Sequence, residues 1–168
     1  MQLQHIDKKI YRSHLKHVIL LVVISMLVIA LSISTLLIEV IGKPEGSNFL
    51  LNLFGVIFAV AVVISVVYKN RLHPYMHEVL YVWQLKQELN AIYRQSAKLK
   101  PAIESKNQNA LIIQYFNLQG SIQLYELDDN DLTLNDLKAD LQALEIELQR
   151  VGIVPDTGLY RRALLEVL

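Results

Sequence analysis

Two long apolar runs restrict what the chain can fold into more than any other feature. Residues 18–38 form a run of 21 residues without a charge, and residues 49–68 form a second run of 20. Lipid offers no water to the backbone, so an apolar run of this length satisfies its N–H and C=O groups internally, as a helix. At about 1.5 Å per residue, each helix reaches about 30 Å, the hydrocarbon thickness of a bilayer. The sequence therefore predicts two membrane spans, over about 18–41 and 49–69.

The segment between the runs predicts a tight turn. Residues 42–48 include two Gly, one Pro and one Asn, which are residues that favour turns. So short a connection makes the second helix return antiparallel, and we expect residues 18–72 to form a transmembrane hairpin. A cleaved signal peptide is the alternative for the first run, because Ala30-Leu31-Ser32 resembles a cleavage triplet. The run is longer than a usual signal-peptide core and continues past that point, which favours the span.

Positive charge brackets the hairpin on the side of both termini. Residues 1–17 hold four basic side chains against one acidic, and Lys69 and Arg71 directly follow the second run, whereas Lys43 near the turn stands between Glu39 and Glu45. The positive-inside rule therefore predicts cytoplasmic termini and an external turn. Residues 1–17 are expected to be a basic cytoplasmic lead-in, either an amphipathic helix at the headgroup level or a frayed tail.

Small and polar residues recur at helical spacing along one face of each run. They are Ser25, Ser32, Thr35, Asn52, Gly55 and Ala59. In an antiparallel hairpin Thr35 would come level with Asn52 and Ser32 with Gly55, and small residues let helix backbones approach closely. We expect this face to pack helix against helix. The alternative is a pore in an oligomer, but no strongly polar group lies at mid-membrane, where a conduit would need one.

Residues 73–168 predict a cytoplasmic bundle of about three amphipathic helices. The hydrophobic pattern places these helices at about 75–99, 109–127 and 134–151, with a short C-terminal helix after them. The predicted fold class is therefore all-α, with an N-terminal antiparallel two-helix transmembrane hairpin before this bundle. Residues 75–168 carry nine basic and 13 acidic side chains, and the absence of a basic stripe argues against nucleic-acid binding.

The apolar faces of the first and third predicted cytoplasmic helices are the candidate interaction residues. Such faces can be buried against each other or against a second copy of the chain. The residues are Trp83, Leu85, Leu89, Ile92, Leu137, Leu141, Leu144 and Leu148. We therefore expect a membrane-tethered interaction or scaffold module that acts through self-association or a protein partner. A small oligomeric pore or transport accessory is the alternative.

Histidines supply the one candidate for chemistry. His14 and His17 precede the first run and His73 and His77 follow the second, so the hairpin would bring both pairs to the same depth. Four imidazoles could bind a divalent metal such as zinc or respond to protons. The alternative is a set of polar residues at the headgroup boundary, and we expect no metal and no cofactor.

The sequence gives little support for other reaction chemistries. Asp128, Asp129 and Asp131 resemble the start of a calcium loop, but the loop lacks the Gly at its sixth position, so a solvated connection between helices is expected. The chain has no cysteine, which excludes disulfides and thiol catalysis. Motifs for a nucleophile or a phosphate loop are lacking too, so we predict a protein that is not an enzyme. An enzyme acting on lipid would have only the histidines in its favour.

Three stretches carry a resemblance to a known family. They are NFLLNLFGV at 48–56, HPYMHEVLYVWQLKQ at 73–87 and YELDDNDLT at 125–133. With them the chain resembles a family of small gammaproteobacterial membrane proteins, known only as a domain of unknown function. The resemblance covers nearly the whole chain and weakens after about Val151. It implies a bacterial inner-membrane protein with two spans and a cytoplasmic helical part, and it brings no activity, ligand or catalytic residue.

Overall fold

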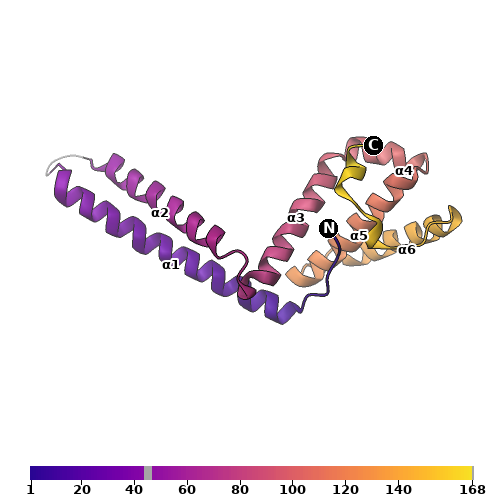
Figure 1. Cartoon of the computed structure of the whole chain (residues 1–168), viewed down its shortest axis with the longest axis horizontal. Helices are drawn as coiled ribbons and strands as arrows, with labels where there is room; N and C mark the ends of the chain where they lie inside the picture. The colour runs from indigo at the N-terminus through magenta and orange to yellow at the C-terminus, as the bar shows by residue number, and fades with distance from the viewer. Residues whose placement is uncertain (44–46, 168) are drawn as a thin grey trace. The chain divides into compact units, whose positions relative to one another are not determined.

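The computed structural model describes residues 1–43 and 47–167, and these residues form helices without strands. The all-α prediction is confirmed. Residues 44–46 of the predicted turn lie outside the described residues. In chain order the elements are α1 (Lys8–Ile41), α2 (Phe49–Lys69), the short 3₁₀ helix η1 (Pro74–Met76), α3 (His77–Arg94), α4 (Ser96–Glu104), α5 (Gln108–Asp128), α6 (Leu134–Arg150), and the 3₁₀ helices η2 (Thr157–Leu159) and η3 (Arg162–Leu165) (Figure 1).

The chain divides into two compact units that differ from the predicted domains. One unit is Ser13–Glu78, and the other combines Met1–Arg12 with Val79–Leu168. The prediction kept residues 1–17 apart as a lead-in and started the second domain at residue 73. The N-terminal segment instead packs with the helices at the other end of the sequence. We call Ser13–Glu78 the hairpin unit and the discontinuous unit the split domain.

In the hairpin unit, α1 and α2 lie side by side and antiparallel (Figure 1). Their contact is close at Gly55, where an added Cβ would lie 2.2 Å from Ser34 Oγ and 3.0 Å from the Ala30 carbonyl oxygen. Ala59 and Val63 continue the buried face of α2. At the turn, the Asn48 side chain accepts a hydrogen bond from Lys43 N at 3.1 Å, so it joins the end of one helix to the start of the other.

In the split domain, α5 is the central helix. It packs against α4, α6, η2 and η3, and Gly120 lets α3 approach, since an added Cβ there would lie 3.1 Å from both Leu85 Cδ1 and Leu89 Cδ2. The predicted amphipathic character of this helix is wrong, because its buried residues surround it on several faces. No charged residue occurs from 108 to 125, as expected of a helix buried on all sides.

The N-terminal segment is fastened to this domain by hydrogen bonds and by burial. Gln4 N donates to the Tyr81 hydroxyl at 2.9 Å, that hydroxyl donates to Gln123 Oε1 at 2.9 Å, and Gln123 Nε2 donates to the Gln4 carbonyl at 2.6 Å. Ile6 and Tyr11 are buried at 8% and 2% exposure. The segment is therefore part of a folded core and not the predicted lipid-surface helix or frayed tail.

Local signals explain where the helices begin and end. Asp7 Oδ1 accepts hydrogen bonds from Lys9 N at 2.8 Å and from Ile10 N at 3.0 Å, which is an N-cap and starts α1 ten residues before the predicted span. Gly152 follows α6 with a φ of 77°, and Ile153 N donates to the Leu148 carbonyl at 2.9 Å, the closing bond of a Schellman motif. Thr133 stands at the N-cap of α6 but its side chain makes no capping bond.

The first predicted cytoplasmic helix is two helices in the structure. The predicted segment 75–99 breaks at Gln95, whose N–H bonds to the Ile92 carbonyl at 2.9 Å, three residues back as in a 3₁₀ turn. A second helix, α4, then continues through Pro101 to Glu104. Proline removes one backbone hydrogen bond, and this short exposed helix tolerates the loss. The predicted count of three helices over residues 75–151 is therefore wrong, and the structure has four.

Candidate functional site

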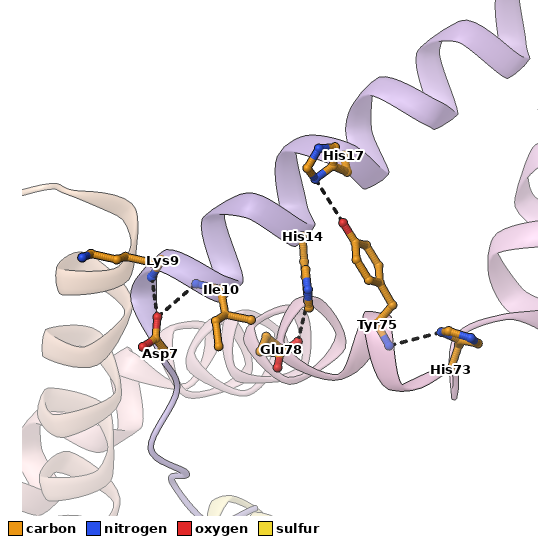
Figure 2. A network of polar contacts seen from close by, with 8 residues as sticks. All are labelled: Asp7, Lys9, Ile10, His14, His17, His73, Tyr75 and Glu78. Carbon is orange, nitrogen blue, oxygen red and sulfur yellow. Dashed lines mark hydrogen bonds and ion pairs between the residues drawn. The ribbon is translucent and has the colours of Figure 1, made fainter.

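The predicted histidine cluster assembles in part, around a tyrosine that the sequence did not single out. In the hairpin unit His14 and His17 project from α1 toward Tyr75 and Glu78, which lie in η1 and in the first turn of α3 (Figure 2). His14 Nδ1 lies 2.9 Å from Glu78 Oε2. The Tyr75 hydroxyl lies 3.1 Å from His17 Nδ1. These contacts join the part of α1 that precedes the first apolar run to η1 and the start of α3.

Tyr75 is the centre of this cluster. Its ring lies against the His14 ring, with centroids 3.8 Å apart and planes tilted by 32°. Its backbone N–H donates to His73 Nδ1 at 3.2 Å, so His73 caps η1 and Pro74 occupies the favoured first helical position. His77 is exposed at the start of α3. The sequence signal for Tyr75 was its place directly after Pro74, where the orientation of the side chain is fixed by the new helix.

No metal site emerges from these residues. Among residues 1–43 and 47–167, no three His, Asp or Glu side chains gather in a geometry that could hold an ion. His14, His17 and His73 each contact a different group (Figure 2). The arrangement is a set of hydrogen bonds among His14, His17, His73, Tyr75 and Glu78, which we call the clasp. It fits this role better than a zinc site, which would need convergent imidazoles.

Glu78 is the charged member of the clasp. Desolvation alone would raise the pKa of Glu78, but a backbone hydrogen bond and the hydrogen bond and charge of His14 outweigh it, and the pKa is lowered. A carboxylate with a lowered folded-state pKa stabilises the fold above the unfolded value, which is about 4.3 for Glu. That contribution is lost as the pH falls through the folded-state pKa.

Replacing Glu78 with Gln is therefore expected to give a pH-dependent loss of stability. At neutral pH the loss should be about 1 kcal/mol, since the side chains of His14 and Glu78 are only about one-fifth exposed. The difference from the wild type should hold above about pH 5 and vanish as the medium becomes more acidic. Thermal unfolding of the purified chain across a pH series measures it, with Glu166→Gln as an exposed control. A difference that does not change with pH would show that Glu78 acts through packing and not through charge.

The structure places the predicted hairpin-packing residues on two different faces. Gly55 and Ala59 are buried against α1, and Ser25 is partly buried. Ser32 and Thr35 are exposed, as is the Asn52 side chain. Ser34 takes the predicted place of Ser32 opposite Gly55, and Ser34 Oγ donates to the Asn52 carbonyl at 3.5 Å. Gly55 thus contacts Ala30 and Ser34, which lie two residues on either side of Ser32. Its level along α1 is that of the predicted pairing with Ser32, but the contacting face of α1 lies on the other side of the helix.

The candidate interaction residues mostly serve the core of the split domain. Leu85, Ile92 and Leu148 are at most 1% exposed. The four remaining leucines of the set are buried or partly buried, and they are Leu89, Leu137, Leu141 and Leu144. Trp83 differs from them because it is 57% exposed on α3. Of the two roles considered for Trp83, core or interaction, its exposure leaves the interaction role, with an aromatic ring on the surface.

The acidic connection after α5 holds the N-terminal segment. Lys8 and Arg12 form ion pairs with Asp129, and Lys86 Nζ lies 2.9 Å from Asp128 Oδ2. Burial, followed by the negative charge of Asp128, raises the pKa of the neighbouring Tyr11 to about 12. Asp128 and Asp129 are thus paired with cations of this chain. They form a connection between helices, as expected, but one that also makes tertiary contacts.

A buried carboxylate on α3 was missed by the sequence reasoning. Glu88 is 8% exposed and accepts a hydrogen bond from the Tyr160 hydroxyl at 2.9 Å. Arg162 Nη1 lies 3.3 Å from its other oxygen, and the Tyr160 ring stacks on Phe116 with centroids 4.1 Å apart. The C-terminal segment is therefore fixed to α3 and α5. The aromatic Tyr160 among polar and turn residues was the available signal.

Comparison with known proteins adds one finding. Searches of curated proteins and of solved structures gave no match. A family model covers residues 1–165. It therefore extends past Val151, where the sequence resemblance weakens, and includes Tyr160 and Arg162, which contact Glu88. The chain belongs to the family described as a protein of unknown function, DUF3087.

Proposed function

We propose that this protein is an integral inner-membrane protein whose hairpin tethers a helical interaction module to the cytoplasmic face. The observation that carries the proposal is the split domain, which combines residues 1–12 with residues 79–168. A folded domain lies on one side of a membrane, so both ends of the inserted hairpin unit must emerge on that side. The chain between them must then cross the bilayer an even number of times, and two apolar helices supply two crossings.

The surface of the hairpin unit supports a lipid environment. α1 and α2 are long and apolar enough to span a membrane by length and composition. Only 6% and 17% of their most apolar windows are buried within the chain, whereas a core helix of a water-soluble protein would be mostly covered. Exposed apolar side chains on this scale need lipid or another protein around them. The basic residues near both ends favour the cytoplasm as the side of the split domain.

Exposed aromatic residues on α3 support the interaction role. Trp83 is 57% and Tyr93 75% exposed, and aromatic side chains are enriched where protein partners bind. The apolar faces first considered for this role are largely buried in the core. We therefore assign partner binding or self-association to the exposed surface of α3, and we propose no enzymatic role.

Labelling of single cysteines tests the topology, because the chain has none of its own. We expect a Ser47→Cys variant to react with a membrane-impermeant maleimide added to intact spheroplasts. Gln2→Cys and Glu166→Cys variants should react only after the membrane is opened. Resistance to carbonate extraction should accompany this pattern. Labelling of Ser47→Cys from the same side as Gln2→Cys, or release of the chain by carbonate, would contradict the proposal.

One observation favours the pore as a second candidate. Ser32, Thr35 and the Asn52 side chain are exposed on helices that are otherwise apolar. Hydroxyl and amide groups in lipid gain from hydrogen bonds across a helix interface, though by only about 0.6 kcal/mol on average. Association of several copies through these exposed residues would bring the polar groups together, around either a dry interface or a conduit. Conductance in planar bilayers distinguishes the two.

A further inference from the structure

The hairpin unit contains an apolar groove between α1 and α2, at the end near His17 and Lys69. Its volume is about 290 Å³, at the lower end of the range for small-molecule sites. Val18, Val22, Ser25 and Ile29 line it from α1, Val66 lines it from α2, and Asn70 lines it directly after α2 ends. The lining is thus mostly apolar, with one hydroxyl from Ser25, and it carries an amide at the end where the chain meets the polar boundary.

The length of the groove fits one leaflet of a bilayer. From Val18 to Ile29, α1 rises about 17 Å, and half of the hydrocarbon core is about 15 Å. Val18 is the first residue of the apolar run and Asn70 follows the second, so the groove starts at the membrane boundary and ends near the middle. A single acyl chain that enters from the boundary would occupy the whole groove.

The charges at the polar end select the headgroup. Lys69 and Arg71 flank Asn70, and Lys16 and His17 precede Val18. Arg71 is held over the Tyr68 ring, with its guanidinium carbon 3.7 Å from the centroid, so its position at this end is restrained. Glu78, the acidic residue of this part of the hairpin unit, faces His14 at 2.9 Å. The excess is positive, and positive juxtamembrane clusters attract anionic lipids.

We propose that this groove binds one acyl chain of an anionic phospholipid of the cytoplasmic leaflet, with the phosphate beside Lys69 and Arg71. This inference rests on the proposed membrane insertion. The mostly apolar wall excludes water from the acyl chain. One N–H of the Asn70 amide donates to the Val66 carbonyl at 2.8 Å, and the second N–H can donate to a phosphate or ester oxygen. The two cations compensate the negative charge. The occupant is a lipid and not a partner helix, because the groove is half a bilayer long and has its charges at one end.

Native mass spectrometry of the full chain tests the site. The protein is reconstituted in nanodiscs of phosphatidylethanolamine and phosphatidylglycerol in equal amounts, then released and stripped of loosely held lipid. Wild-type protein should retain phosphatidylglycerol in preference. The groove-filling variant Val66→Phe should lose most of the retained lipid. Val56→Phe is the control. Val56 is also exposed, at 45%, but it does not line the groove. This variant should retain lipid as the wild type does.

Removal of the charges gives a second, independent readout. The double variant Lys69→Gln and Arg71→Gln should keep an acyl chain but lose the preference for phosphatidylglycerol by about tenfold. Lys98→Gln with Lys100→Gln, in α4, is the matched control. Equal retention by Val66→Phe and Val56→Phe, or equal amounts of both lipids on the wild type, would show annular lipid only and overturn the inference. Carbonate extraction separates the failures: an extracted chain refutes membrane insertion and this site with it, whereas an inserted chain without a lipid preference refutes the site alone.

Discussion

Replacing Tyr160 with Ala is expected to destabilise the split domain by about 3–5 kcal/mol, the usual cost of deleting a buried aromatic ring. The Tyr160 side chain is fully buried, stacks on Phe116 and donates its hydroxyl hydrogen to Glu88. The substitution therefore leaves a cavity beside α5 and also takes a donor from a buried carboxylate. In thermal unfolding of the purified full chain, the midpoint should fall by about 10 °C or more.

Two variants separate the ring from the hydroxyl in this experiment. Tyr160→Phe keeps the ring and should cost about 1–3 kcal/mol, because Glu88 loses a hydrogen bond while it stays buried. Tyr93→Ala removes a tyrosine that is 75% exposed and should change stability by no more than about 0.5 kcal/mol. If Tyr160→Ala unfolded at the same temperature as Tyr93→Ala, the C-terminal segment would not be part of the folded domain.

Replacing Gly55 with Leu is expected to separate α1 from α2. Even the first side-chain atom would lie 2.2 Å from Ser34 Oγ and 3.0 Å from the Ala30 carbonyl oxygen, and the second of these is backbone that cannot rotate away. Overpacking of a tight contact costs about 1–3 kcal/mol or more. Gly55→Ala should already lower the midpoint of thermal unfolding in detergent, and Gly55→Leu should lower it further.

The same variant distinguishes the anchor from the pore. If the hairpin is an anchor, Gly55→Leu weakens each copy of the protein and Val56→Leu, on the exposed face, does not. If Gly55 lines a conduit between copies, Gly55→Leu should leave a stable oligomer with altered conductance. A midpoint equal to that of Val56→Leu, with an intact oligomer, would therefore contradict the packing seen in the hairpin unit.

The sequence predicts the elements of the hairpin well because they depend on little else. The expected second helix, 49–69, coincides with α2, and the first ends at Ile41 as expected. An apolar run has to become a helix wherever it lies, so its ends can be found from composition alone. The face of α1 that contacts α2 is harder to predict from the sequence. Several small residues, among them Ser25, Ser32 and Ser34, would each allow a close approach, and only the three-dimensional contact shows that Ser34 is used.

The parts that the sequence did not reveal depend on residues far apart in the chain. The Gln4–Gln123 and Tyr160–Glu88 contacts join residues 119 and 72 positions apart, and no local pattern encodes such pairs. Of the histidine cluster, the helix register alone explains why His14 and His17 face one direction. The role of Tyr75 depends on the bend at Pro74. The uncharged stretch of α5 was a signal for the central helix that a count of charges could have found.

The split domain has a consequence for synthesis of the protein. Its first twelve residues leave the ribosome long before α5 exists, and both helices of the hairpin are made in between. Ile6 and Tyr11 cannot find their partners until the chain has been translated to about Asp129. Domains usually fold as units once they are complete, so this one closes only after both helices of the hairpin have been synthesised. Under the proposed insertion, these helices have entered the bilayer by then. The domain can be completed only when both ends of the hairpin lie in the same compartment.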